Sequence, residues 1–426
     1  MTDRPTIAII GASFTGLPIA HGLLSHFHKP SSTHQIRLIL INPSPLFYWA
    51  IAAPRILSKP SAFTESQYLL PIAEGFSAYS SDEFEFVLGT ATSVDFSSKT
   101  IIVESSSDHH PTTRDINYDY LVIASGSSTP ATLGLASNPN PNPNNKPTND
   151  NENENGIYPF KSLPTSTPAI QSAITSAQST IANASSIVIA GAGPIGIETA
   201  GELGDLISTR NLTVTLVSAT DRLLPTLKPS AGAAAESLLT SLGVRIVKGR
   251  KVVAATSSSS STTKTVVKLD NGDTLDTDIY IPTTGVVPNS SFLPQEILTP
   301  TGWVQVTPEL QIQGFEDKNV YAAGDITHHK QKLALKVAEM VPVVIGNLID
   351  DITPTSSSSS TKNGNSHCGS TKRKTYIEGE GVSMAVPVGE TGGTGQFFGW
   401  VPWSFLVRVI KGRDFFVGKA RGVVFP

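Results

Sequence analysis

The chain opens with a strand-like apolar run, and the same pattern returns near its middle. Residues 6–10 read T-I-A-I-I and residues 187–190 read I-V-I-A. Each run is followed at once by a glycine-rich turn and then by a segment whose apolar residues recur at helical spacing. The hydrophobic pattern therefore predicts an internal duplication of a strand–turn–helix unit.

Further strands extend each copy in the same order. A second hydrophobic run follows each helix, at 36–41 and 212–217, and each half closes with a similar strand, at 118–126 and 278–285. Strands that alternate with helices in this way are typical of a doubly wound parallel sheet. We predict an α/β protein with two doubly wound, Rossmann-like dinucleotide-binding domains.

Low-complexity segments interrupt this pattern. Asn and Pro dominate residues 138–155, and serine runs occupy 257–261 and 356–360. The second serine run belongs to a longer biased segment, 355–375, which holds the only cysteine, Cys368. Such compositions bury too little apolar surface to offset the entropy of ordering. We therefore interpret all three segments as surface loops, with the loop at 138–155 disordered.

The glycine-rich turns carry the first candidate chemistry. They read G-A-S-F-T-G at 11–16 and G-A-G-P-I-G at 191–196. In a dinucleotide-binding turn the first glycine permits a tight bend, the second lets the backbone approach a phosphate, and the third lets the helix pack close to the strand. The free N–H groups and the dipole of the following helix then face the pyrophosphate. Two matches, each between an apolar strand and a helical pattern, make this interpretation specific.

Both halves depart from the full dinucleotide motif. Ser13 replaces the middle glycine of the first turn, but serine is small and its hydroxyl can donate to a phosphate. The carboxylate expected after the second strand, where it would hold a ribose, is missing, because Asn42 and Ser218 stand there. Without a carboxylate at Ser218 a 2′-phosphate is not repelled, and Arg222 can pair with it. The alternative is that Arg222 forms an ordinary surface pair with Asp221.

A third signature lies at residues 319–327, which read N-V-Y-A-A-G-D-I-T. A strand there runs into Gly324 and Asp325, and an aspartate in this position can accept a hydrogen bond from a ribityl hydroxyl. With this motif added, the order of motifs from residue 6 to about 345 resembles that of the two-dinucleotide-fold flavoprotein reductases.

Two further runs narrow the resemblance. Residues 46–55 read L-F-Y-W-A-I-A-A-P-R, and residues 395–417 read G-Q-F-F-G-W-V-P-W-S-F-L-V-R-V-I-K-G-R-D-F-F-V. Both are similar to the apoptosis-inducing-factor-like group, which includes the ferroptosis-suppressor-like NAD(P)H–quinone reductases. Type II NADH dehydrogenases share the general layout. The first helix region carries no cysteine pair, which separates the chain from the disulfide reductases.

The resemblance implies two cofactors and an order of domains. In this superfamily the first glycine turn holds FAD, the second holds NADH or NADPH, and the Gly-Asp motif closes on the flavin. For this chain it implies an FAD-binding domain formed by residues 1–130 and 286–345. An NAD(P)H-binding domain at 156–285 is inserted between them, and a C-terminal region follows at 346–426.

The resemblance also implies roles for individual residues. Glu198, in the first turn of the second helix, is expected to orient the nicotinamide and to act in catalysis, although a carboxylate at a helix N-terminus also stabilises the helix by itself. Arg55 is expected either beside the flavin or in a salt bridge under the loop, Asn42 on the adenosine ribose, and Lys411 against FAD. The other cofactor-binding candidates are Gly11, Ser13, Gly16, Ala124, Gly126, Gly324 and Asp325 for FAD, and Gly191, Gly193, Gly196, Ser218, Thr284 and Gly285 for NAD(P)H. No metal site is predicted.

These roles lead to a functional hypothesis. We expect an FAD-dependent oxidoreductase that passes hydride from NAD(P)H to FAD and then electrons to a quinone or another small-molecule acceptor. Two alternatives stay open: a flavin oxidoreductase that tailors a specialised metabolite, and a redox-linked cell-death or interaction protein on the same fold. One cysteine in 426 residues excludes an internal cysteine pair, so bound cofactors must carry the redox chemistry. The oligomeric state is left open.

Charge and hydropathy bear on partners and location. The formal net charge of −4 argues against a nucleic-acid partner. No apolar run is long enough to span a membrane, and no signal peptide is recognised, so we expect a cytoplasmic protein. Residues 396–417 combine aromatic and basic side chains, which suits peripheral contact with a membrane. The alternative is that this segment packs as a layer against the FAD domain.

Overall fold

A computed structural model of the chain describes residues 4–29, 34–105, 112–135, 156–163, 167–257, 264–353 and 373–426. The predictions for the loop at 138–155, for nearly all of both serine runs and for Cys368 fall on residues outside these ranges.

The first sheet is built around the N-terminal strand. Its described strands have the order β18-β8-β1-β2-β5-β6-β7. β1 (Thr6–Ile10) pairs in parallel with β2 (Arg37–Asn42) and β8 (Tyr120–Ile123), and β18 (Val320–Ala322) adds to the edge beside β8. Four of the five residues of β1 are buried, as expected for a central parallel strand that reads as one apolar run. Because β18 comes late in the chain, the first sheet combines segments that lie before and after the second sheet in the sequence.

A long strand carries the first sheet into an antiparallel extension. β5 (Phe84–Asp95) begins parallel to β2 and ends antiparallel to β6 (Thr100–Ser105), which pairs in turn with β7 (Thr113–Asn117).

The second sheet repeats the central part of the first. β10 (Ser186–Ala190) lies between β11 (Thr213–Val217) and β16 (Ile279–Pro282), with β12 (Arg245–Val247) beyond β11, and all these pairs are parallel. A separate antiparallel sheet is formed by β13 (Val252–Ser257), β14 (Thr265–Leu269) and β15 (Thr274–Thr277). The duplicated α/β architecture predicted from the sequence is confirmed.

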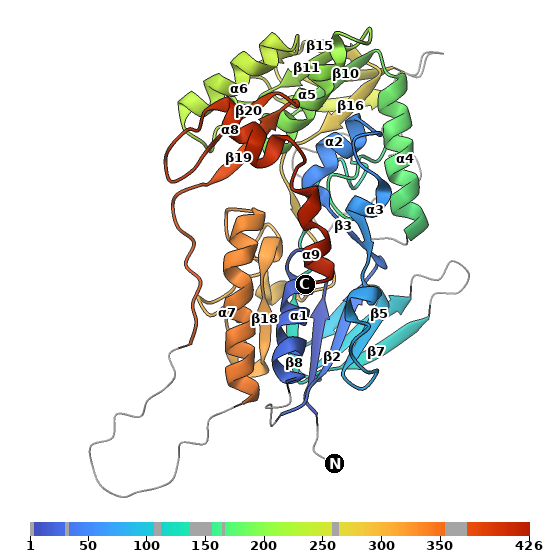
Figure 1. The fold of residues 1–426 in the computed structure, drawn as a ribbon, viewed down its shortest axis with the longest axis vertical. Coiled ribbons are helices and arrows are strands. Elements are labelled where there is room, and N and C mark those ends of the chain that lie inside the picture. Colours follow the sequence, from blue (N-terminus) through green and yellow to red (C-terminus); the bar gives the residue numbers. More distant parts are fainter. Residues whose placement is uncertain are drawn as a thin grey trace, which may run out of the picture.

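The two sheets form two lobes stacked along the long axis of the molecule (Figure 1). In the lower lobe α1 (Gly16–Phe27) packs against α7 (Ala334–Ile352), and in the upper lobe α5 (Pro194–Ile207) packs against α6 (Pro229–Ser241). Proline begins α5 and α6, where its missing N–H costs no helical hydrogen bond. α4 (Thr167–Asn183) runs beside the upper lobe and packs against α2 (Figure 1).

The C-terminal segment joins the lobes. The hairpin of β19 (Met384–Val388) and β20 (Gly392–Gln396) packs on α5 and α6. α8 (Ser404–Val407) follows and continues into a π-helical turn, Arg408–Gly412. The chain then descends to α9 (Arg421–Val424), which packs against α1 (Figure 1).

The remaining elements are short. They are β3 (Leu46–Tyr48), α2 (Ala53–Ser58), α3 (Glu65–Tyr68), β4 (Leu69–Pro71), β9 (Ser127–Ser128), β17 (Val287–Pro288) and the 3₁₀ turns Ala50–Ala52, Ala73–Phe76, Gln295–Ile297, Glu316–Lys318, Gly324–Ile326 and Val417–Lys419.

Two of the predicted domain boundaries need adjustment. Residue 345 lies inside α7, which continues to Ile352, so the helix belongs to the lower lobe as a whole. Residues 156–163 make polar contacts with the first domain, since the Tyr48 hydroxyl donates to the Pro159 carbonyl at 3.0 Å and the Lys161 ammonium lies 2.5 Å from Asp325. The division into three regions otherwise stays a prediction.

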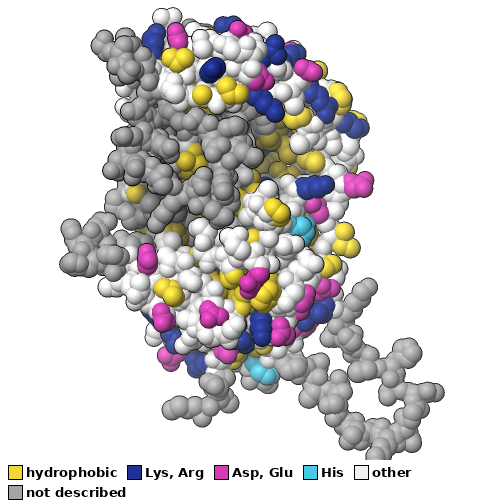
Figure 2. Space-filling model, turned by 180° about the vertical axis from the view of Figure 1, so that it is seen from behind, with side chains coloured by type: hydrophobic (Ala, Val, Ile, Leu, Met, Phe, Trp, Pro, Cys, Tyr) yellow, Lys and Arg dark blue, Asp and Glu magenta, His cyan; other side chains and the backbone are white. Residues whose placement is uncertain are grey.

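The distribution of charged side chains on the surface differs between the lobes. On the face shown in Figure 2, Lys and Arg side chains are more frequent on the upper lobe, and Asp and Glu side chains are more frequent on the lower lobe. Among the described helices, none combines the length and apolar character needed to cross a membrane.

Candidate functional site

The first glycine turn connects β1 to α1 and depends on two of its glycines for packing. Gly11 has φ +105°, and a Cβ there would lie 2.3 Å from the Ala124 carbonyl oxygen. A Cβ at Gly16 would lie 1.8 Å from the Gly11 carbonyl oxygen. Any larger residue at either position would push α1 away from the sheet. Ser13, between them, is half-buried.

The second glycine turn, between β10 and α5, has the same geometry. Gly191 has φ +109°, and a Cβ there would lie 2.5 Å from the Thr283 carbonyl oxygen. A Cβ at Gly196 would lie 1.9 Å from the Gly191 carbonyl oxygen. Gly193 differs, because no atom lies within 4 Å of its Cβ position. The turn therefore leaves open space at its middle glycine, in front of the N-terminus of α5, which fits a pyrophosphate.

The residues at the ends of the second strands hold the turns in shape. Asn42 accepts a hydrogen bond from the Ala12 N–H at 2.9 Å and donates to the Ser44 carbonyl at 2.7 Å. The buried hydroxyl of Ser218 donates to the Thr220 carbonyl at 2.9 Å. Both side chains are thus engaged with the backbone beside the glycine turns.

Other predicted residues line the strand ends next to these turns. Ala124 follows β8, and its N–H donates to the Ile10 carbonyl at 2.8 Å. Gly126 and Gly285 have positive φ angles with open space at their Cβ positions, and Thr284 is exposed. The predicted residues of each half therefore gather at the carboxyl edge of their own sheet, where nucleotides bind in doubly wound folds.

Asp325 is held by two polar side chains. Its Oδ2 lies 2.5 Å from the Lys161 ammonium and accepts a hydrogen bond from the Ser127 hydroxyl at 3.0 Å. Burial raises the pKa of this carboxyl, but Lys161 and Ser127 outweigh burial and bring the pKa below its usual range. Asp325 is therefore a fixed anion. The preceding Gly324 has φ +82°, and a Cβ there would lie 2.2 Å from Thr15 Oγ1, which ties this motif to the first glycine turn.

Glu198 forms an ion pair with a residue from the other end of the chain. Glu198 is buried in α5, and its Oε1 lies 2.6 Å from the ammonium of Lys411 in the π-helical turn. Lys411 also donates to the Ala385 carbonyl at 3.3 Å. Burial raises the pKa of Glu198, and Lys411 opposes that shift. The structure thus brings together two residues that were predicted for different cofactors.

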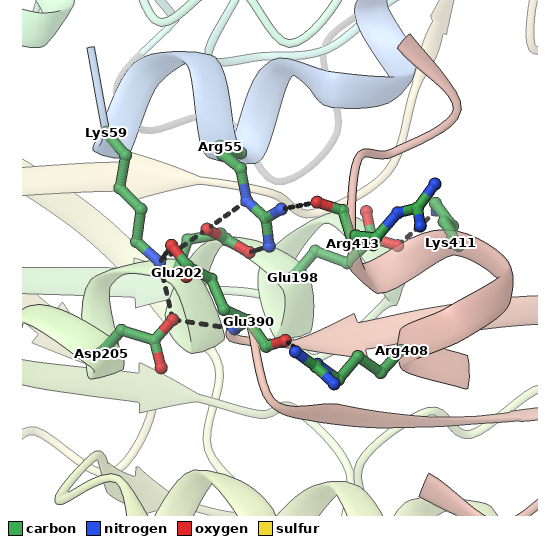
Figure 3. Close-up of polar contacts among 9 residues, drawn as sticks. All are labelled: Arg55, Lys59, Glu198, Glu202, Asp205, Glu390, Arg408, Lys411 and Arg413. Atoms are coloured by element: carbon green, nitrogen blue, oxygen red, sulfur yellow. Dashed lines mark hydrogen bonds and ion pairs between the residues drawn. The ribbon is translucent and has the colours of Figure 1, made fainter. Parts of the chain in front are cut away.

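Arg55 forms a buried salt bridge, the second of its two predicted roles. Its Nε and Nη2 donate to the two carboxylate oxygens of Glu202 at 2.9 and 2.8 Å. Its Nη1 donates to the Arg413 carbonyl at 2.8 Å, and the guanidinium lies 4.8 Å from the centroid of the Phe415 ring. Arg55 therefore links α2, α5 and the C-terminal segment (Figure 3).

One turn further along both helices, Lys59 extends the same cluster. Its ammonium lies 3.1 Å from Glu202, 2.6 Å from Asp205 and 2.9 Å from Glu390 of the hairpin. Arg55 on α2 and Lys59, the residue after its end, thus face Glu202 and Asp205 on α5, and Glu390 of the hairpin contacts Lys59 (Figure 3). We call Arg55, Lys59, Glu198, Glu202, Asp205, Glu390 and Lys411 the ion cluster.

Sequence reasoning missed several of these residues. Nothing in the local sequence marks Lys161, which follows a stretch of low complexity. Glu202 and Lys59 carried a signal that was not used. Arg55 and the capping residue Lys59 are four residues apart at the end of one short helix, and Glu198 and Glu202 are four residues apart on another. Such spacing places each pair on one helix face.

Comparisons with known proteins agree with this geometry. The chain belongs to the pyridine nucleotide-disulphide oxidoreductase family, and the sequence model of that family matches residues 5–340. It is 34% identical over 406 residues to the oxidoreductase ptaL of Pestalotiopsis fici, covering 95% of each chain. It is 25% identical over 424 residues to ferroptosis suppressor protein 1 of Xenopus tropicalis, covering 97% of this chain and 94% of that one. Among solved structures it resembles the sulfide:quinone oxidoreductase of Aquifex aeolicus, with a TM-score of 0.70, 16% identity and coverage of 99% and 92%.

The family and the two glycine turns together define an enzyme. The chain is an FAD-dependent NAD(P)H oxidoreductase, and the predicted resemblance and cofactors are confirmed. With a single cysteine it has no cysteine pair of its own to serve as a redox disulfide, despite the name of the family.

Proposed function

We propose that the enzyme oxidises NAD(P)H and reduces a quinone-like acceptor to the hydroquinone. NAD(P)H loses a hydride and the quinone gains two electrons and two protons, one of them from solvent, so that NAD(P)H, H⁺ and quinone give NAD(P)⁺ and hydroquinone. Bound FAD would supply the two-electron chemistry, and the protein supplies position and charge.

One observation carries the choice of a quinone. The short helical segment from Ser404 to Gly412 exposes Phe405, Val409 and Ile410 to solvent, while Lys411 in the same segment points inward to Glu198. The exposed apolar side chains therefore lie in the same short segment as Lys411, which is paired with the buried Glu198. This arrangement suits an acceptor that is apolar and must receive protons with its electrons. The name of the Aquifex relative, which includes a quinone, supports the same class of acceptor.

Individual roles follow from position. The first glycine turn, with Asp325 fixed beside it, would hold FAD, and the second glycine turn would hold NAD(P)H. The residues we assign are Gly11, Ser13, Gly16, Ala124, Gly126, Gly324 and Asp325 to FAD, and Gly191, Gly193, Gly196, Ser218, Thr284 and Gly285 to NAD(P)H. Glu198 lies just after the first turn of α5, rather than in that turn as predicted, and there its carboxylate would orient the nicotinamide and Lys411 would fix the carboxylate.

An anaerobic titration tests this function. Purified protein should be yellow, its flavin absorbance should bleach on adding NAD(P)H, and a water-soluble quinone should restore the colour. A protein that takes up no FAD, or whose reduced flavin is not reoxidised by any quinone, would refute the proposal.

The exposed apolar side chains also support contact with a membrane surface. Phe398, Trp400, Trp403 and Phe405 are all exposed in one short stretch, near the basic Arg408. Aromatic side chains beside basic ones are typical of proteins that rest on the lipid interface. The part of segment 396–417 around Phe415 is instead buried, as the alternative of a packed layer predicts.

Liposome flotation tests the membrane contact. The wild type should float with anionic vesicles, and a variant with Trp400→Ser and Trp403→Ser should stay in solution, since both rings are exposed and their loss should spare the fold. Equal flotation of the two proteins, or none for either, would contradict the membrane contact.

A tailoring oxidoreductase remains the second candidate. The relative that is 34% identical over nearly the full chain is named only as an oxidoreductase, and this name specifies no electron acceptor. Comparing kcat/KM across quinones and other small-molecule oxidants decides between the two, because a dedicated tailoring enzyme should strongly prefer one non-quinone acceptor.

A further inference from the structure

Three segments of the upper lobe meet at the carboxyl edge of its sheet. The Gly191 N–H donates to the Val217 carbonyl at 2.8 Å, which joins the glycine turn to the end of β11. The Ser218 N–H donates to the Val247 carbonyl at 2.7 Å, and the Arg250 N–H donates to the Ser218 carbonyl at 3.0 Å. The turns that follow β11 and β12 are therefore fixed to each other beside the NAD(P)H turn.

No carboxylate occupies the end of β11 itself. Ser218 stands there, buried, and its hydroxyl is used within its own turn. A carboxylate at this point favours NADH, because it binds the free ribose hydroxyls and repels a 2′-phosphate. The nearest acidic side chain, Asp221, is exposed and lies against Gly249, whose Cβ position is 2.9 Å from Asp221 Oδ1.

Two arginines follow the strand ends at this edge, Arg222 in the turn after β11 and Arg250 in the turn after β12. Arg222 donates to the Pro225 carbonyl at 2.5 Å, and Arg250 donates to the Gly249 carbonyl at 2.8 Å. Within the described part of the chain, neither forms an ion pair with a carboxylate. The neighbouring Lys248 does, since its ammonium lies 2.7 Å from Glu236. Among the described residues, no carboxylate therefore neutralises the charges of Arg222 and Arg250.

We propose that Arg222 and Arg250 bind the 2′-phosphate of NADPH and make NADPH the preferred electron donor. Guanidinium groups pair with phosphate through two parallel hydrogen bonds, which a ribose hydroxyl cannot match. The inference rests on the NAD(P)H-dependent function proposed above, and it adds which donor is used and by which residues. Arg250 lies in the turn after β12, a position that the dinucleotide motif in the sequence does not predict.

Binding of nucleotide fragments tests the proposal without turnover. The probes are 2′,5′-ADP, which carries the extra phosphate, and 5′-AMP, which lacks it, and both are titrated into the FAD-loaded enzyme by calorimetry. The wild type should bind 2′,5′-ADP at least about tenfold more tightly, as expected when charged hydrogen bonds are gained. Arg250→Ala and Arg222→Ala should each remove most of this difference and leave 5′-AMP binding unchanged.

Matched variants distinguish a specific phosphate contact from a general effect of positive charge on nucleotide binding. Lys268→Ala removes one positive charge from β14, in the separate antiparallel sheet, and should bind both fragments like the wild type. Arg250→Lys should fall between Arg250→Ala and the wild type, because it keeps the charge but loses the fork. Equal affinity of the wild type for both fragments, or unchanged preference in the double variant Arg222→Ala/Arg250→Ala, would overturn the proposal. Neither outcome depends on the electron acceptor, so this inference and the quinone proposal fail separately.

Discussion

The ammonium of Lys411 lies 2.6 Å from the carboxylate of Glu198, although the two residues are 213 positions apart in the chain. The pair joins the N-terminal half of α5 to the π-helical turn near the C-terminus. π-Helical turns are rare and often occur at functional sites, because they aim one side chain differently from the rest of the helix. Here that side chain is Lys411, and Glu198 is buried beneath it.

Removing Lys411 should destabilise the protein more than removing the whole pair. Lys411→Met leaves Glu198 buried without its cation, and we expect the free energy of unfolding to fall by about 3–5 kcal/mol. The double variant Lys411→Met/Glu198→Gln should recover most of that loss, since no unpaired charge remains. Urea unfolding of the wild type, Lys411→Met, Glu198→Gln and the double variant measures the coupling. If the single and double variants are equally unstable, the pair is not a coupled unit.

Glu198→Gln should impair electron transfer without impairing FAD binding. The amide keeps the size of the side chain but loses the charge held by Lys411, so the nicotinamide would be less well oriented. Small errors of orientation can reduce rates by about 100-fold, and we expect a loss of that order in flavin reduction. Stopped-flow absorbance under anaerobic conditions gives the rate, and the flavin-to-protein absorbance ratio gives FAD content. A normal rate of flavin reduction would show that Glu198 does not act in catalysis.

Asp325 and Lys161 should differ in their effect on FAD. If Asp325 itself binds the flavin, Asp325→Asn should weaken FAD binding by about 10–100-fold, the range for a charged hydrogen bond. Lys161→Met should have a smaller effect, because the aspartate remains beside Ser127. The double variant Asp325→Asn/Lys161→Met is decisive, since it removes both partners of the ion pair. Full FAD content in the double variant would mean that Asp325 forms the ion pair with Lys161 but does not bind FAD.

The sequence was most informative where one local segment determines the geometry. Gly11, Gly16, Gly191 and Gly196 could be assigned from spacing, because each turn packs against the strand next to it. The ion cluster could not, because it forms between α2, α5 and the C-terminal hairpin, and hydropathy patterns do not show which helix faces which. Asn42 shows a second limit: its residue type suits a ribose, but its amide is engaged with the backbone of Ala12 and Ser44.

The glycines of the second turn offer a test that separates folding from binding. Gly191→Ala should destabilise the protein, because its backbone has a positive φ and its Cβ would meet the Thr283 carbonyl. Gly193→Ala should fold normally, because its Cβ position is open. If a pyrophosphate lies there, the same change should raise the KM for NAD(P)H while leaving FAD content and thermal stability near wild type. An unchanged KM would place the pyrophosphate elsewhere.

His21 should make the protein sensitive to mild acid. The ring is buried in α1 and stacks on Phe76 with centroids 4.1 Å apart. Burial lowers the pKa of His21 to about 4, and a hydrogen bond with the Val424 backbone only partly opposes this. The C-terminal helix α9 therefore packs onto a neutral imidazole.

The sign of the pH effect follows from the depressed pKa. In the unfolded chain the imidazole takes up a proton as the pH falls through about 6.5, whereas in the folded protein it does so only near pH 4. Stability is therefore complete above about pH 6.5, decreases as the pH falls toward 4, and is constant below that, with a total change of up to about 3 kcal/mol from this residue. His329, whose pKa burial also lowers to about 4, adds a loss of the same sign.

A substitution isolates the part due to His21. His21→Phe keeps a flat ring against Phe76 and cannot be protonated, so the decrease in unfolding free energy between pH 7 and pH 4.5 should be smaller than in the wild type. His26→Gln is the matched control, because His26 lies on the same helix but is only half-buried, and its pH dependence should follow the wild type. Urea unfolding at pH 7, 5.5 and 4.5 gives the three curves. Parallel curves for His21→Phe and the wild type would show that protonation of His21 does not weaken the docking of α9.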